Sequence, residues 1–363
     1  MAATPGKPIE SARQQKPSRR KLAPPSKRVT LRDVARAAKV SVMTVSNVVS
    51  GQANVVRPET RRKVEEAITR LKYRPNLNAR SLRLSQAHSV GILIADNDPS
   101  YLSDPFISRL VSGLSNFLSS LDYTLDVQGV TPERFENAAI LRKAGNDALC
   151  AILCGPRPLR LQHLGRLKNL DQPVVVLQEK FDSPSKNVVI VRQDDFAGGE
   201  MVGSHLARTR IRSVLFLRPI IDWCAIEQRY AGLRAGLARA RYRISLDERL
   251  ILSEGFEDTV QGMRSVLATN PPDAIVAATD SMAVAAMTCC EEAGMRVPKD
   301  ISIAGFNGFD VWRYTRPVLT TIMSPAYQMG RYAGEAIVTR LRQGAFPERA
   351  KVFPVSFQAG GST

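Results

Sequence analysis

The segment SVMTVSNVV, residues 41–49, combines a stripe of valines with a second face of mixed chemistry. At the helical period Val45, Val48 and Val49 share one face. The other face carries Val42, Met43, Thr44, Ser46 and Asn47. Valine and methionine side chains can contact thymine methyl groups, and an asparagine amide can pair with adenine through two hydrogen bonds. The segment could therefore read base edges in DNA, although an ordinary exposed helix face has the same pattern.

A shorter pattern directly precedes this segment and completes a helical pair. Thr30 and Asp33 have the spacing of a capping box, and Gly51 suits the end of the second helix. The first pattern breaks at Lys39, and Ser41 then offers a second N-cap. Two helices joined by so short a turn predict a helix-turn-helix, whose second helix can lie in the major groove, with an ordinary helical hairpin as the alternative. The apolar face of the first helix comprises Leu31, Val34, Ala35 and Ala38.

A third helix and a short fourth one follow. Pro58 suits the first position of the third helix, so we expect a three-helix unit over about residues 29–73. Pro75 then interrupts the chain, and Asn76 can cap a short helix over residues 77–84. Because so short a helix is unstable alone in water, this segment is either a linker or a helix that folds on contact. The apolar face of the third helix comprises Val64, Ala67, Ile68 and Leu71.

The positive charge of the chain is concentrated at its N-terminal end. Of a formal net charge of +17, residues 1–88 carry +15, from 20 Lys and Arg against five Asp and Glu. A basic end on a nearly neutral body predicts a polyanionic partner, and DNA fits the helical pair better than anionic lipid does. Residues 1–28 are basic, rich in proline and poor in large apolar side chains, which predicts a disordered arm.

Several classes of protein are disfavoured. The N-terminal arm lacks the apolar stretch of a secretory signal, and no apolar run reaches the length of a membrane span. The five cysteines show no zinc-ligand spacing and are expected to be buried, reduced thiols of a cytosolic protein. We expect no metal and no cofactor. The sequence also lacks GxSxG, Walker A, GxGxxG and HExxH motifs, and its three histidines lie far apart, so we expect no enzyme.

From residue 89 onward, apolar strand-like runs alternate with helical patterns. Continuous runs such as SVGILIAD, PVVVLQEK and SVLFLRP suit strands buried on both faces of a parallel sheet. The alternation predicts doubly wound α/β layers, and its length favours two subdomains with a cleft between them. Ligands of such sheets bind beyond the carboxyl ends of the strands. The clearest helical patterns cover residues 106–121, 196–207, 226–240 and 282–293.

The order of these parts resembles the lactose-repressor (LacI-type) family of bacterial transcription regulators. The segments VTLRDVARAAKVSVMTVSNVVSG and RPETRRKVEEAITRLKYRPNLNARSLR are similar to the family's DNA-binding headpiece and hinge. The blocks SVGILIADNDPSYLSDPFISRLVSGL, EQRYAGLRAGL, AATDSMAVAAM, ISIAGFNGFD and RPVLTTIMSPAYQMGRYA resemble its effector domain. The resemblance implies a type I periplasmic-binding-protein fold and a homodimer or tetramer. It also implies operator binding controlled by a small ligand, commonly a sugar. No leucine-heptad tail follows the core, which favours the dimer.

The resemblance and the composition together predict four regions. These are the disordered basic arm (1–28), the helix-turn-helix DNA-binding headpiece (29–74), the hinge helix and linker (75–88), and the effector-binding and dimerisation core (89–363). Within the core, we expect subdomain 1 over about 89–190 and 324–347, and subdomain 2 over about 191–323 and 348–363.

By match to the family, Val42, Met43 and Asn47 are the base-reading residues. In the hinge, the family implies paired helices in the minor groove, where Leu82 would pry open the central base step beside the small Ala79. The alternative for Leu82 is a plain linker leucine. Hydroxyl and amide side chains that would contact the DNA backbone and set the register are Thr30, Ser41, Thr44, Ser46, Asn54, Thr60, Tyr73 and Asn76.

In the core, Arg229 lies in EQRYAGL and resembles the arginine that clamps the effector in this family. A surface salt bridge is its alternative role. Trp223 is expected to be either a platform for a sugar ring or a core side chain. The other effector-binding candidates match family pocket positions or lie near strand ends, and they are Asp104, Phe106, Gln178, Asp280 and Asn307.

The sequence departs from the family pattern at positions that bear on the ligand and the operator. Asn307 stands where many members have Asp, and an amide there, together with Arg229, favours a sugar acid over a neutral sugar. Asp104, Asp195 and Asp280 could instead keep the cleft negative, which leaves a neutral sugar as the alternative. Further departures are Lys39 in the turn, Arg57 at a helix start, Asn47 on the second helix, and about three additional residues before Asp104.

These observations together predict a sequence-specific DNA-binding regulator of the bacterial cytoplasm, associated with the nucleoid through its operator. The favoured form is a repressor that a sugar or sugar acid releases from the operator. A corepressor-dependent regulator or an activator of the same family stays open. A cytosolic sugar-binding protein without a DNA role is the alternative of another class, and the basic headpiece argues against it.

Overall fold

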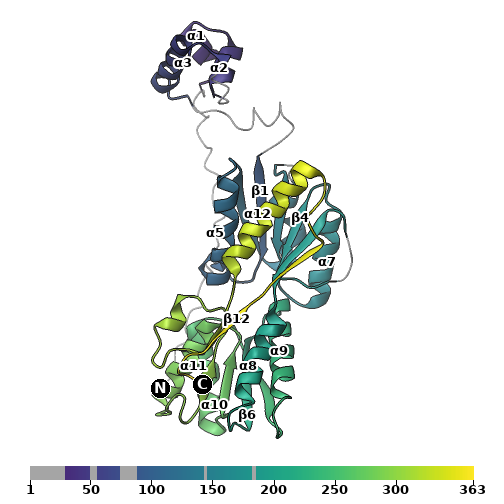
Figure 1. Cartoon of the computed structure of the whole chain (residues 1–363), viewed down its shortest axis with the longest axis vertical. Coiled ribbons are helices and arrows are strands. Elements are labelled where there is room, and N and C mark those ends of the chain that lie inside the picture. Colours follow the sequence, from purple (N-terminus) through teal and green to yellow (C-terminus); the bar gives the residue numbers. More distant parts are fainter. Residues whose placement is uncertain (1–28, 50–54, 74–87, 143–144, 182–184) are drawn as a thin grey trace, which may run out of the picture. The chain divides into compact units, whose positions relative to one another are not determined.

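The computed structural model describes residues 29–49, 55–73, 88–142, 145–181 and 185–363 (Figure 1). The chain divides into two compact units, residues 1–80 and 81–363. In the described ranges no helix has the length and apolar character needed to cross a membrane.

The first unit consists of the helices α1 (Leu31–Ala38), α2 (Val42–Val49) and α3 (Pro58–Arg70). The predicted capping box is present at α1, since the Thr30 hydroxyl accepts from Asp33 N–H and the Asp33 carboxylate accepts from Thr30 N–H. Lys39 ends α1 in the left-handed region at φ 53°, a conformation that favours glycine over residues with a Cβ. The Ser41 hydroxyl caps α2 by accepting from Thr44 N–H at 3.0 Å. The core of this unit contains Val34, Ala35, Ala38, Val45, Val64, Ala67 and Tyr73.

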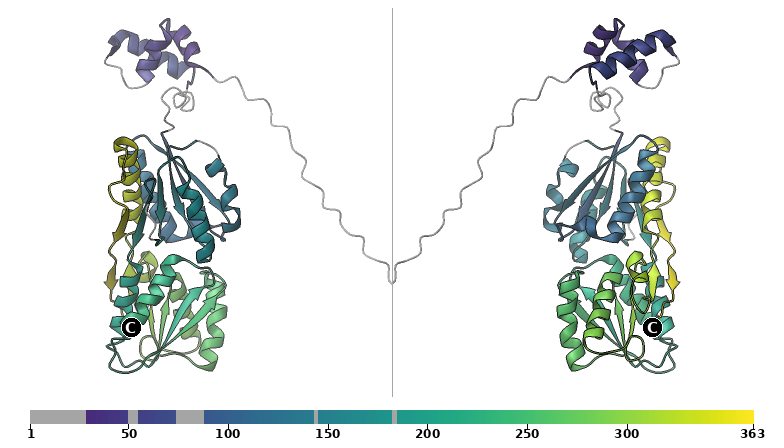
Figure 2. Two further views of the ribbon diagram at one scale, coloured as in Figure 1. Left: turned by 90° about the vertical axis from the view of Figure 1, so that its right-hand side faces the viewer. Right: turned by 90° about the vertical axis from the view of Figure 1, so that its left-hand side faces the viewer.

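The first subdomain of the second unit is built on a six-stranded parallel sheet with the order β11-β5-β4-β3-β1-β2. Helices cover both of its faces (Figure 2). The strands are β1 (Ser89–Ala95), β2 (Thr124–Val130), β3 (Ala148–Ile152), β4 (Val174–Leu177), β5 (Val188–Gln193) and β11 (Ala350–Phe353). The helices are η2 (Tyr101–Ser103), α5 (Pro105–Ser119), η3 (Pro132–Asn137), α6 (Ala139–Arg142), α7 (Arg157–Lys168) and α12 (Ala326–Gln343).

The second subdomain is built on a four-stranded parallel sheet with the order β7-β6-β8-β9. Its strands are β6 (Ser213–Pro219), β7 (Ser245–Ile251), β8 (Ala274–Ala277) and β9 (Ser302–Ala304). Its helices are α8 (Asp195–Leu206), α9 (Cys224–Leu237), α10 (Phe256–Thr269), α11 (Asp280–Glu292) and η4 (Asp310–Arg313). The parallel two-sheet architecture expected from the apolar runs is thereby confirmed.

The chain crosses between these subdomains after β5, after β10 (Thr321–Met323) and after β11. Past the last crossing, β12 (Ser356–Gln358) pairs with β10 in an antiparallel ladder. The subdomain boundary expected at residue 348 needs correction, because β11 still pairs in parallel with β5 of the first sheet. The segment AKVF is a short edge strand of mixed polarity, so its sequence carried no signal of which sheet it joins.

Helices α8 and α9 pack with their backbones in close approach. A Cβ atom added at Gly232 would lie 1.9 Å from the carbonyl oxygen of Phe196, and one at Gly199 would lie 2.1 Å from that of Arg229. Glycine at these positions therefore allows α9 to hold Arg229 directly against the start of α8, where Asp195 lies.

Candidate functional site

The start of α2 presents apolar side chains to solvent. Val42 is 37% exposed and Met43 69% exposed, whereas Val45 on the opposite face is fully buried. Exposure of these two residues matches the face predicted to read bases. Asn47 and Ser46 are partly buried on the same helix.

The predicted backbone-contacting residues fall into three groups. Thr30, Ser41 and Thr44 already serve helix capping, with the Ser41 and Thr44 hydroxyls 2.8 Å apart. Thr60 is partly exposed in the first turn of α3, whereas Tyr73 is only 8% exposed and packs in the core of the unit, which favours a packing role for its ring. Asn54, Asn76 and the minor-groove residues Ala79 and Leu82 lie outside the described residues, as do the basic arm and most of the hinge.

In the second unit, Arg229 is the centre of a buried polar network. Its Nε donates to Asp195 at 2.9 Å, one terminal nitrogen donates to the carbonyl of Ala278 at 2.6 Å, and the other donates to Asn307 Oδ1 at 3.1 Å. Its guanidinium also lies over the ring of Phe306, 3.9 Å from the centroid. Arg229 is only 5% exposed, so the alternative of a surface salt bridge is wrong.

Two glutamines hold the other side of this network. Gln193 donates to Asp195 Oδ1 at 2.8 Å, and Gln178 donates to Asp195 Oδ2 at 3.3 Å while accepting from the backbone N–H of Gln193. Burial raises the pKa of Asp195. The charge of Arg229 and the hydrogen bonds from both glutamine side chains oppose this rise. Gln178 therefore positions Asp195, which in turn fixes Arg229.

Asp280 and Asn307 lie beside each other after β8 and β9. The Asp280 carboxylate accepts from the backbone N–H of Gly308 at 2.7 Å and from the Thr321 hydroxyl at 2.5 Å. Burial raises the pKa of Asp280 to about 7. Asn307 adopts φ 106°, a left-handed conformation that is costly for a residue with a Cβ. Such strain at the end of a strand is typical of functional positions.

A cavity of about 240 Å³ opens in front of this network. Four of the predicted effector residues line it, namely Asp104, Trp223, Asp280 and Asn307. Phe106, Gln178 and Arg229 are not among its lining residues: Phe106 packs near Phe309, with ring centroids 6.5 Å apart, and the other two lie in the network behind. Sequence reasoning missed the other lining residues, and those with acidic or aromatic side chains are Asp96, Asp98, Tyr101, Glu254 and Phe309.

The carboxyl groups of this cavity repel one another. Burial and the negative charge of Asp104 and Asp98 raise the pKa of Asp96 to about 6. Burial, followed by the charge of Asp104, raises the pKa of Glu254 to about 8. Asp104 caps α5 by accepting from Phe106 N–H at 2.7 Å, and burial raises its pKa as well. The cavity is therefore strongly acidic.

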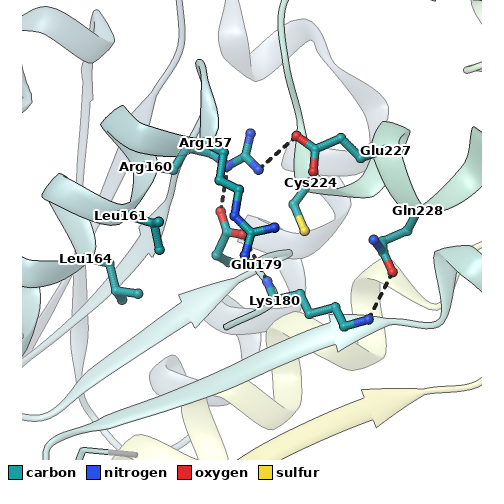
Figure 3. Close-up of a pocket in the computed structure, with 9 residues that line it drawn as sticks. All are labelled: Arg157, Arg160, Leu161, Leu164, Glu179, Lys180, Cys224, Glu227 and Gln228. Carbon is teal, nitrogen blue, oxygen red and sulfur yellow. Dashed lines mark hydrogen bonds and ion pairs between the residues drawn. The ribbon is translucent and has the colours of Figure 1, made fainter. Parts of the chain in front are cut away.

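A second cavity, of about 250 Å³, lies beside Arg160 on α7 (Figure 3). Arg160 is 2% exposed and donates to Glu179 at 2.9 Å and to the carbonyl of Gly155 at 2.8 Å, both in the first subdomain. Its remaining terminal nitrogen reaches Glu227 on α9 of the second subdomain, at 3.1 Å. Gly155 N–H also donates across the subdomains, to the carbonyl of Asp222 at 3.0 Å. The Arg160 side chain and the Gly155 amide thus both link the two subdomains.

Metal binding finds no support in the described part of the chain, where no three His, Cys, Asp or Glu side chains are arranged to hold an ion. All five cysteines are buried free thiols, as predicted, and burial raises the pKa of Cys154 and of Cys224 to about 12. These thiols are accordingly inert packing groups.

Comparison with known proteins matches both units. Residues 30–76 match the family model described as bacterial regulatory proteins, lacI family, and residues 204–363 match that of a periplasmic binding protein-like domain. Catabolite control protein A of Staphylococcus xylosus is 28% identical over 337 residues, covering 92% of this chain and 99% of that protein. The HTH-type transcriptional repressor PurR of Aliivibrio fischeri (strain MJ11) is 28% identical, covering 86% of this chain and 92% of the repressor.

Solved structures agree with these matches. The Lac repressor dimer bound to operator and the anti-inducer ONPF is 25% identical with a TM-score of 0.79, covering 93% of this chain and 99% of that one. A complex of the transcriptional regulator CelR with cellobiose is also 25% identical, with a TM-score of 0.65, and covers 93% of this chain and 100% of that one.

Proposed function

We propose that the chain is a member of the lacI family of bacterial regulatory proteins, that it represses transcription as a homodimer on operator DNA, and that a small molecule in the core cavity controls this binding. The observation that carries the DNA role is the start of α2, where Val42 and Met43 are exposed while Val45 anchors the helix. Apolar side chains held out from a helix-turn-helix can contact thymine methyls in the major groove.

Base readout is assigned to Val42, Met43 and Asn47, and the hinge over residues 75–88 would fold on DNA with Leu82 as its wedge. The net charge of +15 on residues 1–88 supports phosphate neutralisation by this part of the chain. We keep the four regions predicted from sequence, which are the arm, the headpiece, the hinge and the core. Within the core, the last crossing of the chain from the first subdomain to the second follows Phe353. We place the protein in the cytoplasm, on the nucleoid, without an enzymatic role.

The effector class proposed from the comparisons is a sugar, since a related regulator binds cellobiose. The sugar acid favoured by the sequence loses its main support, because the charge of Arg229 already faces Asp195. In the proposed mechanism the effector is an inducer, because its binding releases the repressor from operator DNA. A corepressor-dependent regulator or an activator would show the opposite response to the same ligand.

The test is selection of operator sites from a random DNA pool, followed by fluorescence anisotropy with the full chain. Met43→Ala should cost roughly 1–3 kcal/mol on the selected site and relax preference at one base position in each half-site. Glu66→Ala, on the exposed side of α3, is the control and should leave that preference unchanged. Affinity should also fall steeply as salt rises, because counterions leave the neutralised phosphates. Absence of any selected sequence would refute the DNA role.

A further inference from the structure

The charges around the cavity define the ligand more narrowly than the comparisons do. We propose that the effector carries a protonated amine, so that the cavity selects an organic cation over a neutral sugar or an acid. The inference rests on the proposed function, because it concerns the ligand of the same cavity. An amino sugar would satisfy both statements.

The lining of the cavity is acidic and contains no basic side chain among the described residues. Five carboxyl groups line it. None of the five makes an ion pair with a described cation, and the Glu254 carboxyl also makes no hydrogen bond within the described chain. These lining groups are Asp96, Asp98, Asp104, Glu254 and Asp280.

Arg229 supplies only part of the missing positive charge, because the pKa values of Asp104, Glu254 and Asp280 stay raised although its charge opposes the rise. Its Nε is 2.9 Å from Asp195, and its two terminal nitrogens donate to the Ala278 carbonyl and to Asn307 Oδ1. One guanidinium with its own buried carboxylate cannot neutralise five further acids in front of it. A ligand carboxylate would therefore add to an unfavourable negative potential, whereas a ligand ammonium would relieve it.

The acids also do not form a metal site. They are spread over several walls of the cavity: Asp96 follows β1, Asp104 begins α5, Glu254 follows β7 and Asp280 begins α11. In the described chain no three carboxylates, thiols or imidazoles are arranged to coordinate one ion. Charge distributed in this way suits an extended organic cation more than a point-like divalent ion.

Aromatic side chains complete the fit. Tyr101, Trp223 and Phe309 line the same cavity, and aromatic rings attract ammonium groups through their faces while covering a carbon skeleton. The hydroxyls of Ser103 and Ser281 also line the cavity and can bond polar substituents of the ligand, whereas the Ser253 hydroxyl already donates to Asp258 and accepts from Gly255 N–H. Aromatic surface beside unpaired carboxylates is the arrangement expected of an amine-binding site.

The experiment sorts ligands by charge without requiring their identity. Small molecules of a yeast extract are separated at pH 7 on ion-exchange resins into cationic, neutral and anionic fractions, then treated with chelator and matched in ionic strength. Each fraction is added to the full chain, and both the melting temperature and operator release are measured. Binding to the folded state raises the melting temperature. We expect the cationic fraction alone to act on both.

Glu254→Gln is the informative variant, because it removes a carboxyl that a bound ammonium would hold in its ionised form, without breaking an internal hydrogen bond. About tenfold more of the cationic fraction should be needed for the same effect, as expected for the loss of one close charge contact. Glu257→Gln, three residues further on and exposed, is the matched control and should behave as the parent. The ligand-free Glu254→Gln protein should melt at or above the parent temperature, which shows that it is folded.

The outcomes separate the two proposals. Activity in the neutral or anionic fraction would overturn the amine inference while supporting an effector-controlled repressor. An unchanged response of Glu254→Gln to the cationic fraction would remove this cavity as the cation site. If no fraction alters operator binding or melting temperature, effector control fails, and the inference falls with it.

Discussion

At the scale of single residues, Arg229 is a structural charge as well as a neighbour of the acidic cavity. Removing one partner of a buried ion pair leaves the other charge without compensation, at a cost of about 3–5 kcal/mol. Arg229→Ala should therefore lower the free energy of unfolding by about that amount, because Asp195 would stay buried without its counter-charge. Urea denaturation measures this loss. Adding Asp195→Asn to the same chain should recover part of it, and no recovery would contradict the pairing argument.

The acidic cavity also predicts how stability depends on pH. The folded state raises the pKa of Glu254 to about 8 from an ordinary value near 4.5, through burial and the facing charges of Asp104 and Asp96, opposed by Arg229. Between these values the folded protein keeps a proton that the unfolded chain has lost, so stability falls as pH rises through this window.

Melting temperatures from pH 5 to pH 9 measure this dependence. The parent should lose more stability across the range than Glu254→Gln. A residual slope should remain in the variant, since the pKa values of Asp280 and Asp96 are also raised, to about 7 and about 6. Parallel curves for the parent and the variant would show that Glu254 titrates normally.

At the scale of elements, the contact between α8 and α9 depends on glycine. Gly232→Ala would place a methyl group 1.9 Å from the Phe196 carbonyl oxygen, so the helices would have to separate. We expect a loss of roughly 1–3 kcal/mol, the usual cost of overpacking. Gly165→Ala in α7 is the control, because nothing lies within 4 Å of its added Cβ. Alanine there should be neutral or stabilising by up to about 1 kcal/mol, and equal destabilisation by both would refute the packing argument.

At the scale of the whole core, the Arg160–Glu227 pair links the two subdomains whose relative movement would carry the effector signal. Glu227→Gln weakens this link and leaves Arg160 neutralised by Glu179. Since partly exposed pairs are worth up to about 1 kcal/mol, opening of the subdomains should become about two- to fivefold more frequent. Hydrogen exchange of the Gly155 amide, which bonds Asp222 across the subdomains, reports that opening.

The matched control for the link is Glu200→Gln. Glu200 pairs with Arg239 within the second subdomain, and the exposure of its side chain, 31%, is close to the 35% of Glu227. Exchange at Gly155 should be unchanged in this variant. Equal exchange in both variants would show that the pair does not restrain the subdomains.

Features that depend on neighbours in the chain were predictable from the sequence. The capping box of Thr30, the cap at Ser41 and the start of α3 at Pro58 appear where the residue types placed them. The apolar runs became the buried strands, because the side-chain period of a strand is a local property. The strand β7 was missed, since SLDERLI is an exposed edge segment with no apolar run, and Glu254 after it was missed for that reason.

The sequence by itself therefore determined the class of fold, the helix-turn-helix and the general place of the cavity at the strand ends. Only the tertiary structure decided that the charge of Arg229 faces Asp195, 34 residues away along the chain, rather than a ligand. It also decided that Arg160 spans both subdomains and that five carboxyl groups share one cavity. The reason is physical: pairing and desolvation of charges depend on which distant segments the fold brings together, and no local pattern records that.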